Sequence, residues 1–240
     1  MTSTALFDRV AARYDALWTT TPIGRAQRDL VWRDMDPLFQ PGQRILDIGC
    51  GTGEDAAHFT SRGVTVHATD ASRAMIEIAH ARGITAAVCR AEDLAQLGGI
   101  FDGAISNFGA LNCVEDLPAV ARSLAALVRP GGRVAICLLG RFCAWETLYC
   151  GARMQWSKAF RRWSGYAPPA YYPKISQVRA AFAPAFELQR WTGIGLCVPP
   201  SYVHLPAFVV GCFAACDRLL ARLPLLRAIA DHRLLLLVRK

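Results

Sequence analysis

The sequence lacks any pair of cysteines in the Cys-x-x-Cys spacing of metal sites and redox motifs, although 9 of its 240 residues are cysteine. Several of them, such as Cys89 and Cys137, lie within apolar, strand-like runs. Cysteines in such runs behave as small apolar core residues. We therefore predict reduced thiols in a cytoplasmic protein, with neither a disulfide framework nor a metal site.

The start of the chain also lacks a basic segment followed by an apolar one, so a secretory signal is not expected. Charged residues are missing from residues 191–216, which raises the question of a membrane span. Prolines and glycines interrupt this stretch, and its clean apolar run, Leu205 to Cys216, is shorter than the roughly 20 residues that cross a bilayer. A lid over a binding site, or an element on a membrane surface, fits the stretch better.

Acidic residues are in deficit: 27 Lys and Arg against 19 Asp and Glu give a formal net charge of +8. The basic residues concentrate in 153–162 and 218–240, among apolar and aromatic residues. A nucleic-acid groove usually presents a more continuous basic face, so a nucleic-acid partner is not expected. Peripheral contact with an anionic membrane and a merely solvated basic surface both stay open.

Against these absences, residues 45–53 form one dense pattern, Ile-Leu-Asp-Ile-Gly-Cys-Gly-Thr-Gly. The apolar run that ends at Asp47 predicts a buried parallel strand. The glycines after it permit positive φ angles, so a flat ligand can lie against the backbone with an anionic end at the next helix. Gly51-x-Gly53-x-x-Ala56 also matches a relaxed dinucleotide fingerprint, but Asp47 would repel a pyrophosphate and attract a sulfonium or ammonium group.

The Asp-x-Gly-x-Gly-x-Gly pattern resembles the first motif of the class I S-adenosylmethionine-dependent methyltransferases, and the resemblance extends through most of residues 5–139. Segments 64–70, 101–107 and 127–134 are similar to that family's second, fourth and fifth strands. The resemblance implies a doubly wound, seven-stranded, mostly parallel α/β sheet and S-adenosyl-L-methionine as cofactor. The alternation of strands and helices over residues 43–139 separately predicts a parallel sheet that binds its ligand beyond the carboxyl ends of its strands.

The expected cofactor residues follow these strand ends. Asp47 and the glycine loop would hold the methionine end, and Asp70 has the spacing of a ribose-binding carboxylate. By resemblance, residues 91–92 lie near the adenine and residues 107–108 near the transferring methyl, while Arg90 stands where many relatives carry an acid or amide. The predicted set is Tyr14, Asp47, Gly49, Cys50, Gly51, Gly53, Asp70, Ala71, Ala91, Glu92, Asn107 and Phe108.

We expect a single methyltransferase domain over residues 1–240, which includes two N-terminal helices within residues 5–36. Pro22-Ile23-Gly24 is predicted to separate these helices. The first resembles the leader helix that many small-molecule methyltransferases fold over the cofactor. Tyr14 on this helix would either help close the pocket or pack under the edge of the sheet.

Two insertions depart from the minimal fold. A cap insertion at residues 140–174 carries a dense aromatic helical stretch from Phe142 to Trp163, which favours a pocket for an apolar ligand over a core. A lid insertion at residues 193–228 carries an apolar helical stretch through Leu226.

Transfer of an electrophilic sulfonium methyl depends mainly on aligning the nucleophile and excluding water. A hydroxyl or neutral amine acceptor would also need a base to take its proton. Candidates for that base, all within the insertions, are His204, Tyr171, Tyr172 and Glu146. None of them belongs to a recognisable catalytic pair, and the oligomeric state stays open.

The sequence thus indicates a methyltransferase that acts on a small, largely apolar molecule, with the acceptor atom (O, N, S or C) undetermined. One alternative is an RNA or protein methyltransferase that uses the basic surface, although Phe108-Gly109 after Asn107 differs from the Asn-Pro-Pro-Tyr loop that grips nucleobase amines. Another is an NAD-dependent oxidoreductase, which Asp47 disfavours. A cofactor-binding module without catalytic activity is a third.

Overall fold

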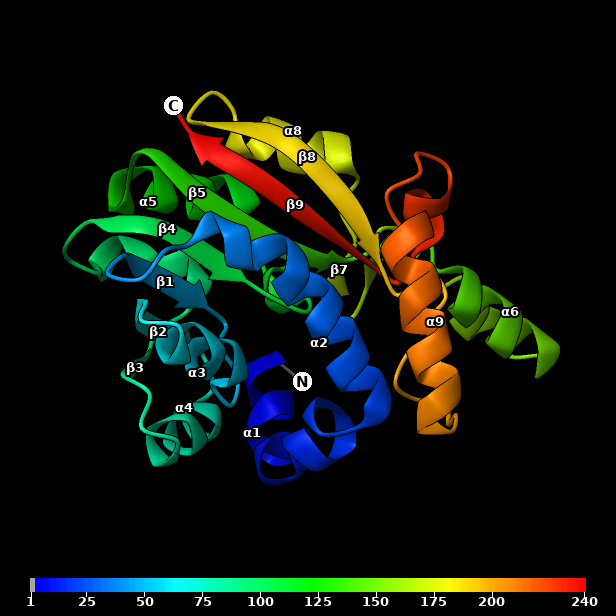
Figure 1. Ribbon diagram of the computed structural model, residues 1–240. Helices are drawn as coiled ribbons and strands as arrows, with labels where there is room; N and C mark the ends of the chain where they lie inside the picture. The colour runs from blue at the N-terminus through cyan, green and yellow to red at the C-terminus, as the bar shows by residue number, and fades with distance from the viewer. Residues whose placement is uncertain (1–2) are drawn as a thin grey trace.

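The computed structural model describes residues 3–240; residues 1 and 2 of the predicted domain lie outside this range. Its main sheet has the strand order β3-β2-β1-β4-β5-β9-β8 (Figure 1). The strands are β1 Arg44–Ile48, β2 Thr65–Asp70, β3 Ala86–Val88, β4 Phe101–Ser106, β5 Val128–Leu139, β8 Phe186–Ile194 and β9 His232–Arg239. β3, β2, β1, β4 and β5 pair in parallel, and β9 runs antiparallel to β5 and β8. The predicted seven-stranded, mostly parallel sheet is confirmed.

Helices cover both faces of the sheet, which therefore has an apolar cluster on each side. They are α2 Pro22–Met35, α3 Glu54–Ser61, α4 Arg73–Ala81, α5 Leu117–Leu127, α8 Ile175–Phe182 and α9 Ala207–Leu220. Leu30 of α2 and Phe59 of α3 pack with Ile45 and Ile105 on one face. Helices α5 and α8 pack on the other face, against apolar residues of β1, β5 and β9. Burial on both faces explains why the strands read as continuous apolar runs.

The strand order places a crevice between β1 and β4. From β1 the chain moves through α3 to β2 and β3 on one side, and then returns to build β4 and β5 on the other. Loops after β1 and β4 consequently leave the sheet in opposite directions at its carboxyl edge, where ligands of such folds bind. The hydroxyl of Ser106 donates to the carbonyl of Ile48 over 2.9 Å and ties the two strand ends together.

The N-terminal segment forms α1 Ser3–Tyr14, a π-helical turn Asp15–Thr19 and then α2. The prediction that Pro22-Ile23-Gly24 separates two helices is wrong, because these residues form the first turn of α2. Thr21 caps that turn by accepting a hydrogen bond from the Gly24 amide over 3.0 Å. Proline suits this position since its missing N–H would have no partner in a first turn anyway.

The cap insertion is two short helices and a hairpin: α6 Ala144–Ala152, α7 Trp156–Ala159, β6 Tyr166–Ala167 and β7 Ala170–Tyr171. Its expected helical stretch is broken at Met154, whose φ of 56° no helix accommodates. In the lid insertion, α9 ends at Leu220, before a 3₁₀ turn at Leu226–Ile229. Helices α6 and α9 lie side by side at one end of the molecule (Figure 1). Of the helices in the described range, none is long and apolar enough to span a bilayer.

Candidate cofactor cleft

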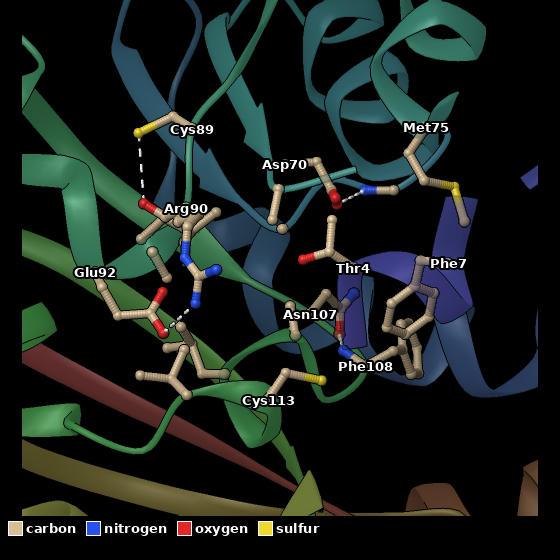
Figure 2. Close-up of a pocket in the computed structure, with 18 of the residues that line it drawn as sticks. Thr4, Phe7, Asp70, Met75, Cys89, Arg90, Glu92, Asn107, Phe108 and Cys113 are labelled. Atoms are coloured by element: carbon tan, nitrogen blue, oxygen red, sulfur yellow. Dashed lines mark hydrogen bonds and ion pairs between the residues drawn. The ribbon is translucent and has the colours of Figure 1, made fainter. Parts of the chain in front are cut away.

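A cleft opens at the carboxyl edge of the sheet (Figure 2). Its walls come from α1, the loops after β1 to β4, and the 3₁₀ turn Ala110–Cys113. Lining residues include Thr4, Phe7, Tyr14, Gly49, Gly51, Asp70, Ala71, Met75, Cys89, Arg90, Ala91, Glu92, Asn107, Phe108, Leu111, Cys113 and Val114.

Two glycines shape the floor of the cleft for different reasons. Gly49 has a φ of 72°, and a Cβ there would lie 2.3 Å from the Cβ of Ala110, so the loop after β4 requires a glycine at this position. Gly51 has a φ of 54°, and a Cβ there would meet nothing within 4 Å. The backbone at Gly51 is therefore open to a ligand, as the sequence pattern predicts.

Asp70, at the end of β2, is held by backbone amides on both of its oxygens. The Gly51 amide donates to Oδ2 over 2.9 Å, and the Ser72 amide donates to Oδ1 over 2.8 Å. Burial raises the pKa of Asp70, although these two hydrogen bonds oppose the increase. Each carboxylate oxygen keeps acceptor capacity after one such bond, and Figure 2 shows Asp70 at the wall of the cleft. A vicinal diol such as a ribose fits this arrangement.

Asp47 lies behind the glycine loop and is only 1% exposed. Within the described range neither of its carboxylate oxygens has a hydrogen-bond partner. Burial raises its pKa well above the ordinary value, and the charge of Asp55 adds to the increase. A buried acid without a counter-ion attracts cations, so the orphaned carboxylate fits the positively charged methionine end of S-adenosylmethionine.

A buried ion pair supports the loop after β4. Arg28 of α2 contacts Oδ2 of Asp55 in α3 at 2.6 Å, and the Asn107 side-chain amide donates to the same oxygen over 3.1 Å. The guanidinium lies 4.7 Å from the ring centre of Trp18 and 4.9 Å from that of Phe108. Phe108 has a φ of 46°, unusual for a bulky residue, and this packing holds it there.

The N-terminal helices close over the cleft. Tyr14 lines it, as one of the two predicted alternatives proposes, and burial raises the pKa of its hydroxyl to about 12, so it stays neutral. The Thr52 hydroxyl in the glycine loop donates to Asp15 over 2.7 Å, and Arg82 pairs with the same carboxylate. The Ser72 hydroxyl donates to Asp8 of α1. These contacts fasten the N-terminal helices to the loops that form the floor.

Most of the predicted cofactor residues meet in this one cleft although they are far apart in sequence. Those that line it are Tyr14, Gly49, Gly51, Asp70, Ala71, Ala91, Glu92, Asn107 and Phe108. Asp47, Cys50 and Gly53 are not among its lining residues in the described range: Asp47 lies behind the loop, and Gly53 caps α3. Their roles in binding stay predictions.

The cleft also contains residues that sequence reasoning did not assign. Phe7, Met75 and Cys113 belong to this group, and Arg90 points toward Glu92, 3.3 Å away (Figure 2). Met75 could have been found from its place in the first turn of the helix after β2. Cys113 could not, because nothing in the sequence marks the 3₁₀ turn that contains it.

The candidate bases lie away from the cleft lining. His204 is exposed in the segment before α9, and Tyr171 and Tyr172 line a separate groove beside α5 and α8. Glu146 is 2% exposed and is held by Arg161 and Arg162 at 2.8 and 2.9 Å. Burial alone would raise the pKa of Glu146, but the two arginines outweigh burial and lower it. No group of three or more His, Cys, Asp or Glu within residues 3–240 is arranged to hold a metal ion.

Sequence reasoning missed His232, the first residue of β9. The antiparallel register pairs it with Leu139 and so brings it to the carboxyl edge of the sheet. Its ring centre lies 5.4 Å from that of Phe108, and its Nδ1 lies 3.4 Å from Oδ2 of Asp231. Burial lowers the pKa of His232, although Asp231 opposes the decrease. An antiparallel final strand is the signal that could have placed this residue, and a purely parallel sheet would have put it at the other edge.

The chain is similar to known methyltransferases. Residues 24–191 match the family model described as a methyltransferase domain. Over 136 residues, 55% of this chain and 57% of the relative, the chain is 32% identical to the demethylmenaquinone methyltransferase of Mycolicibacterium paratuberculosis. A similar match joins it to the Mycobacterium marinum enzyme of the same name. The chain thus matches little more than half the length of these relatives.

Solved structures show the same fold at low identity. Magnesium protoporphyrin IX methyltransferase from Synechocystis with bound S-adenosylhomocysteine superposes with a TM-score of 0.58 at 20% identity, over 91% of this chain and 86% of that one. The [4+2]-cyclase SpnF superposes with a TM-score of 0.62 at 16% identity, over 99% and 95%. The family-model match covers most of the chain and agrees with the glycine loop, Asp70 and the strand order. The chain belongs to the class I S-adenosylmethionine-dependent methyltransferase family.

Proposed function

We propose that this protein transfers the methyl group of S-adenosylmethionine to a small, largely apolar acceptor. The observation that carries the proposal is the pair of acids at the glycine loop: Asp70 on the cleft wall and the unpaired Asp47 behind the loop. Such a site favours a ribose with a cationic tail over a pyrophosphate. Because a [4+2]-cyclase shares the fold, the fold alone does not identify the reaction, and the support comes from these residues.

The cofactor supplies an electrophilic methyl, and the chain supplies position and shielding. Asp70 would hold the ribose, the Gly49–Gly53 backbone the methionine end, and Ala91 and Glu92 would lie near the adenine. Phe108, packed between Trp18 and His232, would border the reacting methyl and keep water away from it. His204, Tyr171, Tyr172 and Glu146 remain predicted bases for an acceptor that must lose a proton.

A small apolar acceptor agrees with the lining of the cleft, where Phe7, Leu111 and Val114 face the same space as the predicted methyl site. It also agrees with the name of the curated relatives, demethylmenaquinone methyltransferases. Peripheral contact with a membrane would suit such an acceptor, since an apolar molecule partitions into bilayers.

Calorimetry with S-adenosylmethionine, S-adenosylhomocysteine and NAD tests the cofactor. We expect both sulfur nucleosides to bind and NAD not to; tight NAD binding with neither nucleoside bound would overturn the proposal. A methyl-release assay against lipid extracts, thiols and RNA then tests the acceptor. Preferential methylation of RNA would favour the alternative of an RNA methyltransferase.

A further inference from the structure

The cap presents a group of exposed apolar side chains, three of which are aromatic rings packed against one another. Leu148, Met154, Trp156, Phe160 and Trp163, here called the cap patch, are between 41% and 78% exposed. The rings of Phe160 and Trp163 are 4.9 Å apart, and Trp156 stacks on Phe160 with centres 6.3 Å apart. A cluster of exposed aromatics this dense on a soluble surface marks an interaction site.

The exposed charged residues within the cap segment, residues 141–163, have one sign. Arg153 and Lys158 are exposed within it, and the guanidinium of Arg153 lies 4.2 Å from the ring centre of Tyr149. The one acid of residues 141–163 is Glu146, which is buried between Arg161 and Arg162. The surface that a partner meets in this segment is therefore apolar and cationic.

Helix α9 also exposes apolar side chains. Phe208, Cys212, Ala215 and Leu219 are exposed at helical spacing, and Phe208 and Leu219 are 75% and 79% exposed. The only acid of α9, Asp217, is fully buried and accepts hydrogen bonds from the amides of residues 196–198. Trp145 of α6 contacts Phe213 of α9 with ring centres 6.1 Å apart, so the two elements form one end of the molecule (Figure 1).

Exposed apolar side chains together with cations favour a lipid bilayer over a second copy of the chain as the partner of the cap patch. In a symmetric dimer the patch would face itself and bring Arg153 and Lys158 toward their own copies, with no exposed acid in the segment to offset them. An anionic bilayer neutralises these cations, and tryptophan rings favour its interface. Charge complementarity thus selects the membrane.

We propose that the cap patch docks the protein on an anionic lipid bilayer, with Trp156, Phe160 and Trp163 in the interface and Arg153 and Lys158 against lipid headgroups. Because the cap follows the carboxyl end of β5, docking there brings the cleft side of the sheet toward the source of an apolar acceptor. This consequence rests on the proposed function, but the docking itself does not.

Co-sedimentation with vesicles of phosphatidylcholine alone and with added phosphatidylglycerol tests the docking. We expect binding to the anionic vesicles that weakens with salt. The double substitution Arg153→Gln and Lys158→Gln should lower the partition coefficient about 25-fold, at roughly fivefold per cation. Trp156→Ala with Phe160→Ala should lower it about tenfold or more.

Matched controls lie at the opposite edge of the sheet: Ile100→Ala, which is 58% exposed, and Lys240→Gln. Both should bind vesicles like the unaltered protein. Failure of the unaltered protein to bind anionic vesicles, or equal binding by the cap variants, would overturn the docking. A dimer that Trp156→Ala and Phe160→Ala dissociates would instead assign the patch to a second copy. Binding of S-adenosylhomocysteine, measured on every variant, reports folding and tests the proposed function separately.

Discussion

Two buried carboxylates, one at the cofactor cleft and one in the cap, differ in their hydrogen bonding and in the direction of their pKa shifts. Asp47 is 1% exposed, and neither of its oxygens has a hydrogen-bond partner within the described chain. Glu146 is 2% exposed and receives hydrogen bonds from both Arg161 and Arg162. Burial raises the pKa of Asp47 unopposed by any hydrogen bond, whereas the arginines reverse the effect of burial at Glu146.

The difference predicts different roles: Asp47 is expected to serve a ligand, whereas Glu146 stabilises the fold. An unpaired buried acid costs stability, and such costs are found where a ligand is to be bound. The paired acid of the cap instead fixes α6 against the segment after α7, and through Arg162 against Asp231 before β9, at 2.9 Å. The cofactor cleft is therefore expected to lose function when altered, and the cap to lose stability.

The largest expected effect is on the cap network. Arg162→Ala leaves Glu146 and Asp231 buried without their shared counter-ion, and it should lower the free energy of unfolding by about 3–5 kcal/mol. Arg161 contacts the same carboxylate, but its side chain is 46% exposed, so Arg161→Ala should cost less than about 1 kcal/mol. Urea unfolding of the two variants measures both values. Equal losses would show that burial does not separate the two arginines.

In the cofactor cleft, the substitution Asp70→Ala should have its largest effect on the affinity for the cofactor. Losing the acceptor for a ribose diol should weaken binding of S-adenosylhomocysteine by about 2–3 kcal/mol, because the lost hydrogen bonds involve a charged group. The chain should stay folded with a lower unfolding midpoint, because Ala leaves the Gly51 and Ser72 amides without their acceptor. Calorimetry measures the affinity, and Glu77→Ala on the exposed face of α4 is the control. Unchanged affinity would show that the ribose is held elsewhere.

The sequence could predict the cofactor region in detail because its signals are local. An apolar strand, a glycine loop and an acid at the next strand end specify one edge of a parallel sheet, and Gly51 and Asp70 lie where those signals place them. The contacts of Arg28 and His232 depend instead on how distant elements pack. Arg28 meets Asp55 only through packing of α2 on α3, and His232 reaches Phe108 only through the antiparallel register of β9. Neither contact has a sequence period that reveals it.

Asp47→Asn tests the cost of the unpaired acid. Its raised folded-state pKa means that the folded chain keeps a proton that the unfolded chain releases above the ordinary value of 3.8. Stability therefore falls as the pH rises from about 3.8 toward the folded-state pKa, and Asn removes this decline. We expect Asp47→Asn to be more stable at neutral pH, by on the order of 1 kcal/mol. Thermal melts between acidic and neutral pH, on both proteins, measure it.

Binding of the cofactor should show the matching pH dependence. A cation near Asp47 favours its ionised form, so binding of S-adenosylmethionine releases a proton, and affinity should increase with pH up to the folded-state pKa. Asp47→Asn should bind more weakly and lose this dependence. If the variant kept both the affinity and its pH dependence, the unpaired acid would not serve the ligand.

The smallest expected effect is at Asp15, where the N-terminal helices are fastened to the glycine loop. Asp15→Ala removes the acceptor for the Thr52 hydroxyl and a partner of Arg82. Because the Asp15 side chain is partly exposed, the change should weaken cofactor affinity only about threefold to fivefold. The dissociation rate should rise by a similar factor, since the contact holds closed a segment whose residue Tyr14 lines the cleft. Stopped-flow fluorescence of the tryptophans measures that rate, and Asp29→Ala on the exposed face of α2 is the control. A change in affinity carried by the association rate alone would mean that the contact shapes the open cleft and does not keep it closed.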